Sequence, residues 1–358
     1  MHSNDQNSKL FQKKDLWLVP LMTVLAWLLS LLAIYDISSL PLFSGGTVAD
    51  VEISDLYNAV GNRRRISQKA AHTTVVSIDG CSRAQISEVL ERIAYMEPSA
   101  LGLDVFFIKE DADGAALEEA LKGFDTVVLP VDLHHPDGVS FFQNRIPGAR
   151  EGFVNLLSSN ATGSVREFSC VREGISSFAY VLAGEPPLET VRSNLIRFDG
   201  TTIPVIPAQE LSWSDEEDIR GRIVLMGAME DPSDMHRTPL GFQTSGVLLH
   251  AVVTEMMASG KYLRRSAGWL ETSVAFFFCA LFLTLTLVVK RKWDDAGTLG
   301  MRAVQLLLIF GLFIIGCKLY ISFGWYFNLA LTITMLAFGA LVFDIVAGLY
   351  ALIPDKKI

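Results

Sequence analysis

The sequence has little cysteine and no excess of basic residues. Four of its 358 residues are Cys, and Asp and Glu outnumber Lys and Arg by 39 to 30. Residues 36–267 hold 32 of the acidic and 20 of the basic side chains. Because a nucleic-acid-binding surface needs a basic face to meet the phosphates, this balance argues against nucleic acid as a partner. Cys81 and Cys170 lie in this segment, and the sequence leaves open whether they form a disulfide.

The common motifs of catalysis are also missing. The chain has no Gly-rich phosphate loop with Lys and Ser or Thr, no Gly-x-Ser-x-Gly elbow and no His-Glu-x-x-His helix. Cys81 could act as a nucleophile with His250 as its base, but a Cys that follows a strand is more often structural. We therefore expect a protein that is not an enzyme and that needs no cofactor.

Charge is nearly absent from three long apolar runs. Two runs of 19 and 18 residues carry no charged side chain, and a third, residues 303–352, contains only Lys318 and Asp344. The third run is about twice the roughly 20 residues that cross a bilayer once, and Gly324 with its aromatic neighbours indicates a turn within it. The sequence thus predicts four transmembrane helices, at residues 16–35, 268–289, 303–322 and 325–352.

Basic residues orient these helices. Lysines precede the first helix, basic residues follow the second, and two lysines follow the fourth. We therefore expect a cytoplasmic head (1–15), loop (290–302) and tail (353–358), with an extracytoplasmic domain at residues 36–267. The basic residues just before the second helix oppose this orientation. The first helix is interpreted as an uncleaved anchor, because its apolar core is longer than that of a signal peptide.

The extracytoplasmic segment begins with a strand, a helix and a second strand. Thr73–Asp79 and Ala100–Phe107 are nearly continuous apolar runs, which is typical of strands covered on both faces of a parallel sheet. The helix between them, Ser82–Met96, has one apolar side. Further buried strands follow at Thr126–Val131 and Arg222–Gly227. The sequence predicts an α/β fold: a mixed, largely parallel extracytoplasmic sheet with flanking helices, plus four transmembrane α-helices.

Carboxylates stand where several of these strands end. Asp79 and Asp104 end strands that we expect to be neighbours, Asp132 ends the third, and Asp234 follows the strand that ends at Gly227. Ligands of open parallel sheets bind at the carboxyl edge, and convergent carboxylates would suit a cation or a cationic small molecule. The alternative is that each Asp caps the next helix or turn, which we favour for Asp79. Asp104 lies inside an apolar run, so of the four we expect it to be the one that is buried and hydrogen-bonded. Burial would raise its pKa unless it has a partner.

Thr238 and His250 complete the candidate ligand-binding set. Thr238 opens a shaped turn, and His250 is expected to form a hydrogen bond that locks this loop against its helix. Asp234, His236 and His250 could chelate a metal ion, but no further ligand with recognised spacing is present. We therefore predict no metal site.

The chain contains a series of short segments in a fixed order: Val76–Asp79, Pro98–Phe107, Val128–Pro130, Gly152–Asn155, Val165–Arg166, Ser177–Ala179, Ile223–Gly227, Thr238–Gly241 and Gly246–Ala251. This series resembles the second class of CHASE extracellular sensory domains over roughly residues 50–261. The resemblance implies a bacterial inner-membrane receptor with a periplasmic sensor followed by three membrane spans. In relatives the spans lead to a nucleotide cyclase or a kinase, whereas here only residues 353–358 follow.

The leading hypothesis is a membrane sensor that binds a small molecule, an ion or a protein and signals through its spans to a separately encoded effector. Its expected partners are the lipid bilayer, a membrane or cytoplasmic protein and a second copy of itself. The alternative is a non-enzymatic scaffold subunit of a cell-envelope complex. An ion-coupled transporter using Asp344 or Lys318 is a third hypothesis, although snorkelling to the membrane surface explains both residues.

Overall fold

The chain forms two compact units, Asn58–Arg264 and the combination of Met1–Tyr57 with Arg265–Ile358. We call them the α/β unit and the helical unit. The computed structural model describes residues 16–36, 52–64, 68–107, 114–134, 145–159, 164–191, 193–198, 200–239 and 241–351. The predicted cytoplasmic head and tail lie outside these described residues.

A six-stranded sheet forms the centre of the α/β unit, and all of its strands are parallel. The predicted parallel sheet is therefore confirmed. Thr73–Asp79 and Ala100–Phe107 do not form neighbouring strands, however, because the strand near residue 225 pairs with both. The order is β11 (Val205–Pro207), β2 (Thr73–Ser77), β12 (Ile223–Gly227), β3 (Ala100–Asp104), β4 (Val127–Val131) and β5 (Arg150–Phe153).

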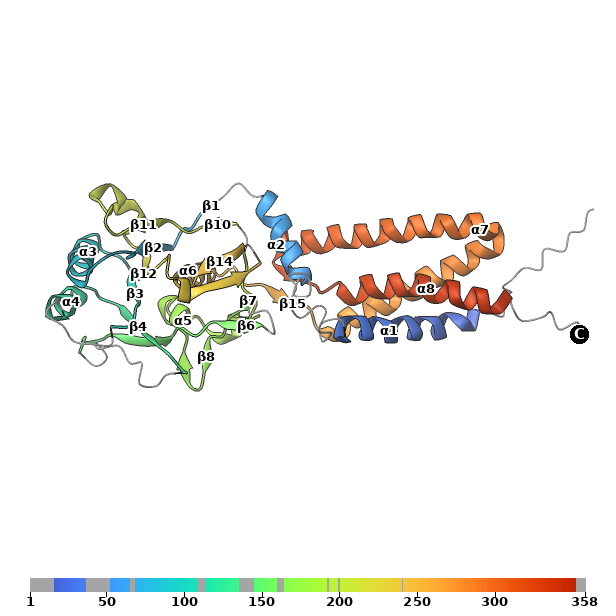
Figure 1. The fold of residues 1–358 in the computed structure, drawn as a ribbon, viewed down its shortest axis with the longest axis horizontal. Coiled ribbons are helices and arrows are strands. Elements are labelled where there is room, and N and C mark those ends of the chain that lie inside the picture. The colour runs from blue at the N-terminus through green and yellow to red at the C-terminus, as the bar shows by residue number, and fades with distance from the viewer. Residues whose placement is uncertain are drawn as a thin grey trace, which may run out of the picture. The chain divides into compact units, whose positions relative to one another are not determined.

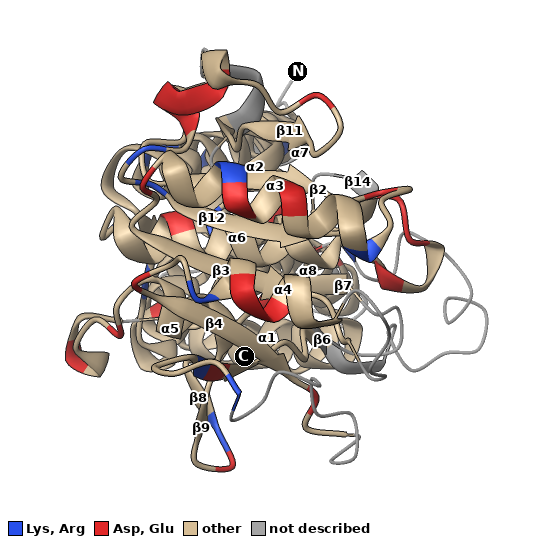
Figure 2. Cartoon of the chain, turned by 90° about the vertical axis from the view of Figure 1, so that its left-hand side faces the viewer, with Lys and Arg blue, Asp and Glu red and all other residues tan. Residues whose placement is uncertain are grey.

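Helices cover both faces of this sheet, which explains why its strands are apolar throughout. Helices α3 (Arg83–Tyr95) and α4 (Gly114–Leu121) lie in front of the strands in Figure 2 and pack against side chains such as Leu101 and Leu103. Helices α5 (Phe178–Leu182) and α6 (Gly246–Ala258) cover the opposite face. The result is a three-layer α/β/α unit.

Helix α3 begins at a capping box, with the Ser82 hydroxyl accepting from the Gln85 backbone N–H and the Gln85 side chain accepting from the Ser82 N–H.

A smaller sheet with antiparallel and parallel pairs lies beside the main one. Its strands are β14 (Gly241–Ser245), β13 (Met235–Thr238), β7 (Ser164–Glu167) and β6 (Leu157–Ser159). Shorter elements are β1 (Gln68–Lys69), β8 (Val171–Arg172), β9 (Ile175–Ser176), η3 (Leu188–Thr190), β10 (Thr201–Thr202), η4 (Trp213–Asp218) and η5 (Pro232–Asp234). The boundaries of the unit fall within α2 (Ile53–Arg64) and β15 (Arg264–Arg265).

The helical unit contains α1 (Leu18–Asp36), α7 (Gly268–Phe323) and α8 (Ala330–Ala351), with the short strand β16 (Trp325–Tyr326) before α8. Helix α7 reverses direction without a break in its helical assignment (Figure 1). A Cβ built on Gly297 would lie 3.1 Å from the carbonyl oxygen of Val289, whereas eight residues of straight helix span about 12 Å. The predicted loop at 290–302 is therefore a helical bend, and the predicted turn at Gly324 is present as a left-handed C-cap.

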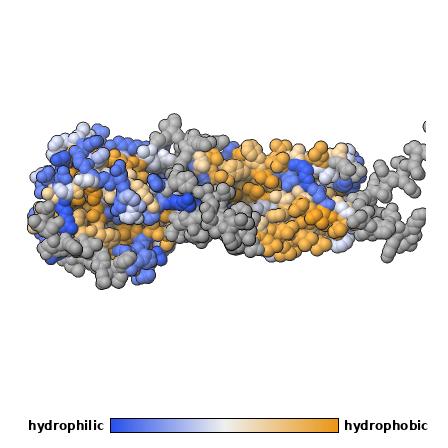
Figure 3. Space-filling view, viewed as in Figure 1, coloured by the Kyte–Doolittle hydropathy of each residue, from blue (hydrophilic) through white to orange (hydrophobic). Residues whose placement is uncertain are grey.

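Three helical segments in the described part of the chain are long and apolar enough to cross a membrane: Gly268–Trp293, Ala296–Phe323 and Ala330–Tyr350. The apolar stretch of α1, Leu18–Ile34, is shorter, so the predicted count of four spans is not confirmed. Figure 3 shows an apolar surface over α7 and α8 and a largely hydrophilic surface over the α/β unit. This difference matches helices that face lipid and a domain that faces water.

Two acidic residues of the helical unit, Asp344 and Glu271, have partners. Arg302 on α7 forms an ion pair of 2.5 Å with Asp344 on α8 and donates to the Ala340 carbonyl oxygen at 2.9 Å. At the other end of these helices, the Glu271 carboxylate accepts from the Asn328 backbone N–H at 3.0 Å and from the Ser266 hydroxyl. The Asp344 carboxylate is therefore stabilised by pairing with Arg302, and not only by the snorkelling expected from the sequence, and Glu271 is stabilised by hydrogen bonds.

Candidate functional site

Parallel pairing brings the carboxyl ends of β2, β12, β3 and β4 to one edge of the main sheet. Asp104 is the last residue of β3, Asp79 follows β2 by two residues, and Asp132 follows β4 directly. The chain after β12 returns to the same edge with Asp234, because Asp234 contacts the beginning of α6 beside Gly227. The four carboxylates nevertheless have different surroundings.

Asp79 holds the loop that follows β12. Its carboxylate accepts hydrogen bonds from the backbone N–H of Met229 at 2.9 Å, from that of Glu230 at 3.1 Å and from the Ser77 hydroxyl. Burial by itself would raise the pKa of Asp79, but these hydrogen bonds outweigh it and lower the pKa below 3.8. The expectation that Asp79 caps the following helix is wrong, because Ser82 caps α3. Asp79 instead connects the end of β2 to the loop after β12, whose residue Met229 lies 150 positions later in the sequence.

Asp132 and Asp234 are also bound to neighbouring groups. The Asp132 carboxylate accepts from the His134 backbone N–H at 2.9 Å and from the Asn155 side-chain amide at 2.7 Å. The Asp234 carboxylate accepts from the Gly246 backbone N–H at 3.0 Å and lies 3.0 Å from His236 Nε2. Gly246 is the first residue of α6, so Asp234 supplies a negative charge to the positive end of that helix.

Asp104 differs from the other three carboxylates. Leu101 and Leu103 pack toward α3 and α4, so strand alternation places Asp104 on the side of α5 and α6. A Cβ on Gly227 would lie 3.2 Å from the Asp104 Cβ and 2.9 Å from Val247 of α6, so only glycine fits between them. Among the described residues, no group donates a hydrogen bond to the Asp104 carboxylate, so the expectation that it is hydrogen-bonded is wrong for this part of the chain. Burial, together with the negative charge of Asp234, raises the pKa of Asp104 from 3.8 to about 7.

His250 and Thr238 have structural positions. The buried His250 ring donates its Nε2–H to the Val154 carbonyl oxygen at 3.1 Å and packs edge-on against Phe178. Burial lowers the pKa of His250 to about 4, so the ring is neutral near pH 7. The Thr238 hydroxyl lies 3.3 Å from that of Thr244 in the β13–β14 hairpin. His250 therefore locks α6 to the chain just after β5. The prediction of a hydrogen bond inside the domain is met, but the expected partner, the Thr238–Gly241 loop, is wrong.

No group of three or more His, Cys, Asp or Glu residues in the described part of the chain could hold a metal ion. A hollow of about 780 Å³ lies at the far end of α6 from the four carboxylates. Its lining comes from residues 186–190 and from the segment that follows α6, including Tyr262 and Arg264. The structure thus places a concave surface at a position that the sequence analysis did not predict.

Cys81 and Cys170 are free thiols. Cys81 packs against the core between the sheet and α3, whereas Cys170 packs in a separate cluster with α5 and α6. Burial and the nearby Asp79 charge raise the pKa of Cys81, and burial raises the pKa of Cys170 to about 11. An activated nucleophile needs a lowered pKa instead.

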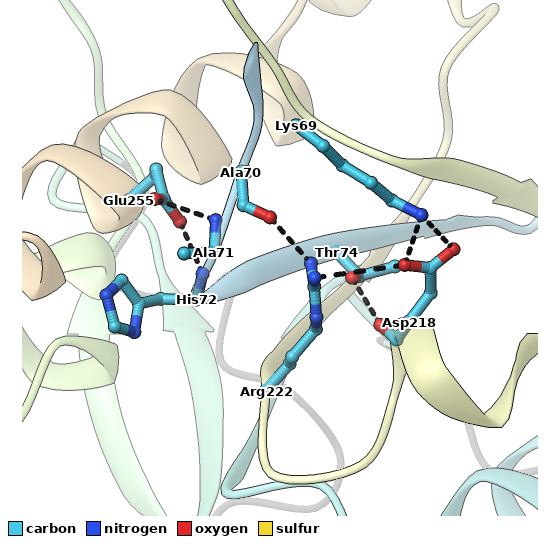
Figure 4. A network of polar contacts seen from close by, with 8 residues as sticks. All are labelled: Lys69, Ala70, Ala71, His72, Thr74, Asp218, Arg222 and Glu255. Carbon is cyan, nitrogen blue, oxygen red and sulfur yellow. Dashed lines mark hydrogen bonds and ion pairs between the residues drawn. The ribbon is translucent and has the colours of Figure 1, made fainter.

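Sequence reasoning missed a polar network at the amino edge of the sheet, drawn in Figure 4. Glu255 of α6 is 5% exposed, and its two carboxylate oxygens accept from the backbone N–H groups of Ala71 at 3.1 Å and His72 at 2.9 Å. These amides directly precede β2. The signal in the sequence was a single acidic residue within the otherwise apolar helix Gly246–Ala258.

The same network continues through a second acid. Arg222, which precedes β12, donates to the Ala70 carbonyl oxygen at 2.8 Å and lies 3.9 Å from the Asp218 carboxylate. Asp218 also forms an ion pair of 2.5 Å with Lys69 and accepts, through its backbone carbonyl, from the Thr74 hydroxyl. The chain entering β2 is thereby fixed to both β12 and α6.

A family model described as the CHASE2 domain matches residues 65–289, which is more than half of the chain. The chain belongs to the CHASE2 family. This match confirms the resemblance found in the sequence, and it extends past the α/β unit into the first half of α7. No curated protein and no solved structure matched the chain. The α/β unit is therefore a CHASE2 sensory domain, and long apolar helices follow it.

Proposed function

We propose that this CHASE2 protein is a multi-pass sensor of the bacterial inner membrane, with its α/β unit in the periplasm and both termini in the cytoplasm. The observation that carries the proposal is the order of parts: a CHASE2 sensory domain, followed directly by helices long and apolar enough to span a bilayer. The sensor acts by binding a ligand or partner, not by catalysis, and its spans carry the signal to an effector that is a separate protein.

The proposal includes α1 as a fourth span. The α1 side chains Leu18, Met22 and Ala26 belong to one buried apolar cluster with residues of α7 and α8. A helix that packs in this way against two membrane-length helices shares their environment. Four spans put both termini on the same side, which agrees with the distribution of basic residues.

The architecture of the domain suggests how a signal leaves it. The chain enters the main sheet through Ala70–His72 and leaves the domain after α6, and Glu255 joins these two segments by its two hydrogen bonds. A change in the position of α6 would therefore move both the segment that enters the sheet, Ala70–His72, and the segment that leaves the domain after α6. The domain can pass on a shift of one helix as a change in two segments at once.

Cysteine labelling in cells tests the orientation. In a background with the native cysteines replaced, we expect a membrane-impermeant maleimide to label Tyr95→Cys in spheroplasts, because Tyr95 is 77% exposed on the α/β unit. Lys292→Cys, at the bend of α7, should be labelled only after the membrane is permeabilised. The reversed result would place the α/β unit in the cytosol and end the proposal.

Photo-crosslinking tests the separate effector. Leu307 is 71% exposed on the second half of α7, so a crosslinker placed there should capture one stoichiometric membrane partner. Leu312 on the same half is 7% exposed and serves as the matched control that should give only crosslinks within the chain. Lipid adducts alone from position 307, together with no partner co-purifying, would contradict a separate membrane effector.

A further inference from the structure

Two carboxylates at the carboxyl edge of the CHASE2 sheet have opposite environments. Asp79 has three donors to its carboxylate, two of them backbone N–H groups. Asp104 ends β3, which is separated from β2 by β12. No described residue donates a hydrogen bond to the Asp104 carboxylate. A carboxylate with donors favours its charged form, whereas a buried carboxylate without donors favours the neutral acid.

The charged neighbours of Asp104 are few. The strands that flank β3, Ile223–Gly227 and Val127–Val131, contain no ionisable side chain. On the covering helices, Tyr180 of α5 donates to the Pro186 carbonyl oxygen, His250 is neutral and bound to Val154, and Glu255 is bound at the far edge. The groups that act electrostatically on Asp104 are Asp234 and His236.

Asp234 links Asp104 to α6. Its carboxylate holds the first N–H of α6, at Gly246, and the ring of His236, each at 3.0 Å. The backbone fits closely here, because a Cβ on Gly246 would lie 2.5 Å from both Asp234 oxygens. An ionised Asp104 adds a second negative charge beside Asp234, and repulsion between two nearby carboxylates opposes the contacts that Asp234 makes.

We propose that Asp104 is a proton-binding site of the CHASE2 domain, and that its proton controls how firmly Asp234 holds the N-terminus of α6. The inference rests on the proposed sensory function and identifies its stimulus as the acidity outside the membrane. With the proton bound, Asp234 is the only charged member of the pair and α6 is held. When the proton leaves, the contact weakens. Helix α6 ends at Ala258, and α7 begins ten residues later at Gly268.

The raised pKa of Asp104, at about 7, supports this proposal because the carboxyl group would change its charge near neutral pH. Asp79 does not change in this range, since its pKa is lowered. His250 stays neutral there, because its pKa lies at about 4. Of these three groups, only Asp104 gains or loses charge between pH 5 and pH 8.

Hydrogen–deuterium exchange of the full chain in nanodiscs tests the proposal. After correction for the intrinsic pH dependence of exchange, we expect the opening equilibrium of residues 246–249 to rise between pH 5.5 and pH 8, by at most about tenfold per pH unit. Asp104→Asn should abolish this dependence, and Asp79→Asn should keep it. A flat wild-type profile, or an Asp104→Asn profile equal to the wild type, would overturn the proposal.

A second variant separates a titrating site from a merely structural one. Asp234→Asn removes the neighbouring charge but keeps an oxygen that can accept from Gly246. We expect the midpoint of the wild-type pH profile to move to lower pH in this variant, because Asp104 then ionises more easily. An unchanged midpoint would contradict the proposed coupling. Because cysteine labelling reports topology independently, failure of the proton site and failure of the membrane-sensor function can be distinguished.

Discussion

Glu255 and Asp218 at the amino edge of the CHASE2 sheet have partners that Asp104 at the carboxyl edge lacks. At the amino edge, Glu255 accepts from two backbone N–H groups, and Asp218 is paired with Lys69 and Arg222. At the carboxyl edge, Asp104 lies against Gly227 and Val247 with no donor among the described residues. A satisfied carboxylate stabilises one arrangement of the chain, whereas an unsatisfied one makes the arrangement depend on its charge. We call the amino edge a fixed joint, because its hydrogen bonds and ion pairs hold one arrangement of the chain. We call the carboxyl edge adjustable, because its arrangement depends on the charge of Asp104.

The largest expected effect comes from the titration of Asp104. Its pKa is higher in the folded chain, about 7 against 3.8, so the folded state holds a proton that the unfolded state releases. The stabilisation is complete below pH 4 and is lost as the pH rises to about 7, by up to about 1.4 kcal/mol per pH unit. Asp104→Asn should therefore be more stable than the wild type at pH 8 and similar to it near pH 4, as measured by denaturation of the full chain in detergent.

Equal stabilities of Asp104→Asn and the wild type at pH 8 would contradict the contrast between the two edges. Asp132→Asn is a suitable control for this measurement, because its carboxylate has donors from His134 and Asn155. It should show no gain at pH 8.

The next largest effect is expected at the amino edge. Glu255→Ala leaves the N–H groups of Ala71 and His72 without their acceptor and removes packing at a site that is 5% exposed, so we expect a loss of about 3 kcal/mol. Glu210→Ala, which changes an exposed side chain, should cost almost nothing. Thermal unfolding of the two variants at one pH measures the difference. A loss of less than about 1 kcal/mol for Glu255→Ala would show that this edge is not a fixed joint.

A smaller effect is expected for Asp79, which is a satisfied carboxylate at the adjustable edge. Asp79→Asn weakens three hydrogen bonds, and we expect a loss of about 2 kcal/mol at pH 7. The pKa of Asp79 is lowered by folding, so its stabilisation is present above pH 4 and is lost as the pH falls through the folded value. The difference between variant and wild type should therefore shrink in acid. A difference that grows in acid would reverse the assigned direction.

The sequence predicted the elements of this fold better than their partners. Apolar runs such as Thr73–Ser77 and Ala100–Asp104 identified parallel strands, because burial on both faces leaves a local pattern. The position of β12 between them leaves no such pattern. The apolar run around Asp104 predicted a hydrogen-bonded carboxylate, with a raised pKa only if no partner was present. The missing donor, and so the raised pKa, became visible only in the structure. The role of Glu255 depends on the backbone N–H groups of Ala71 and His72, which are 184 and 183 residues away. The local spacing of apolar residues cannot predict so distant a contact.

The smallest effect is expected in the helical unit, where the same reasoning about partners applies to an exposed pair. Arg302 and Asp344 form an ion pair, but Asp344 is 54% exposed, so neutralising it should cost less than about 1 kcal/mol. Asp344→Asn keeps an oxygen for Arg302, and Arg302 also keeps its hydrogen bond to the Ala340 carbonyl oxygen. We therefore expect normal abundance, normal detergent stability and unchanged exchange at residues 246–249. Loss of signalling with normal abundance in Asp344→Asn would instead favour an ion path through the helices. Weakening the exposed Arg302–Asp344 ion pair would not by itself abolish signalling.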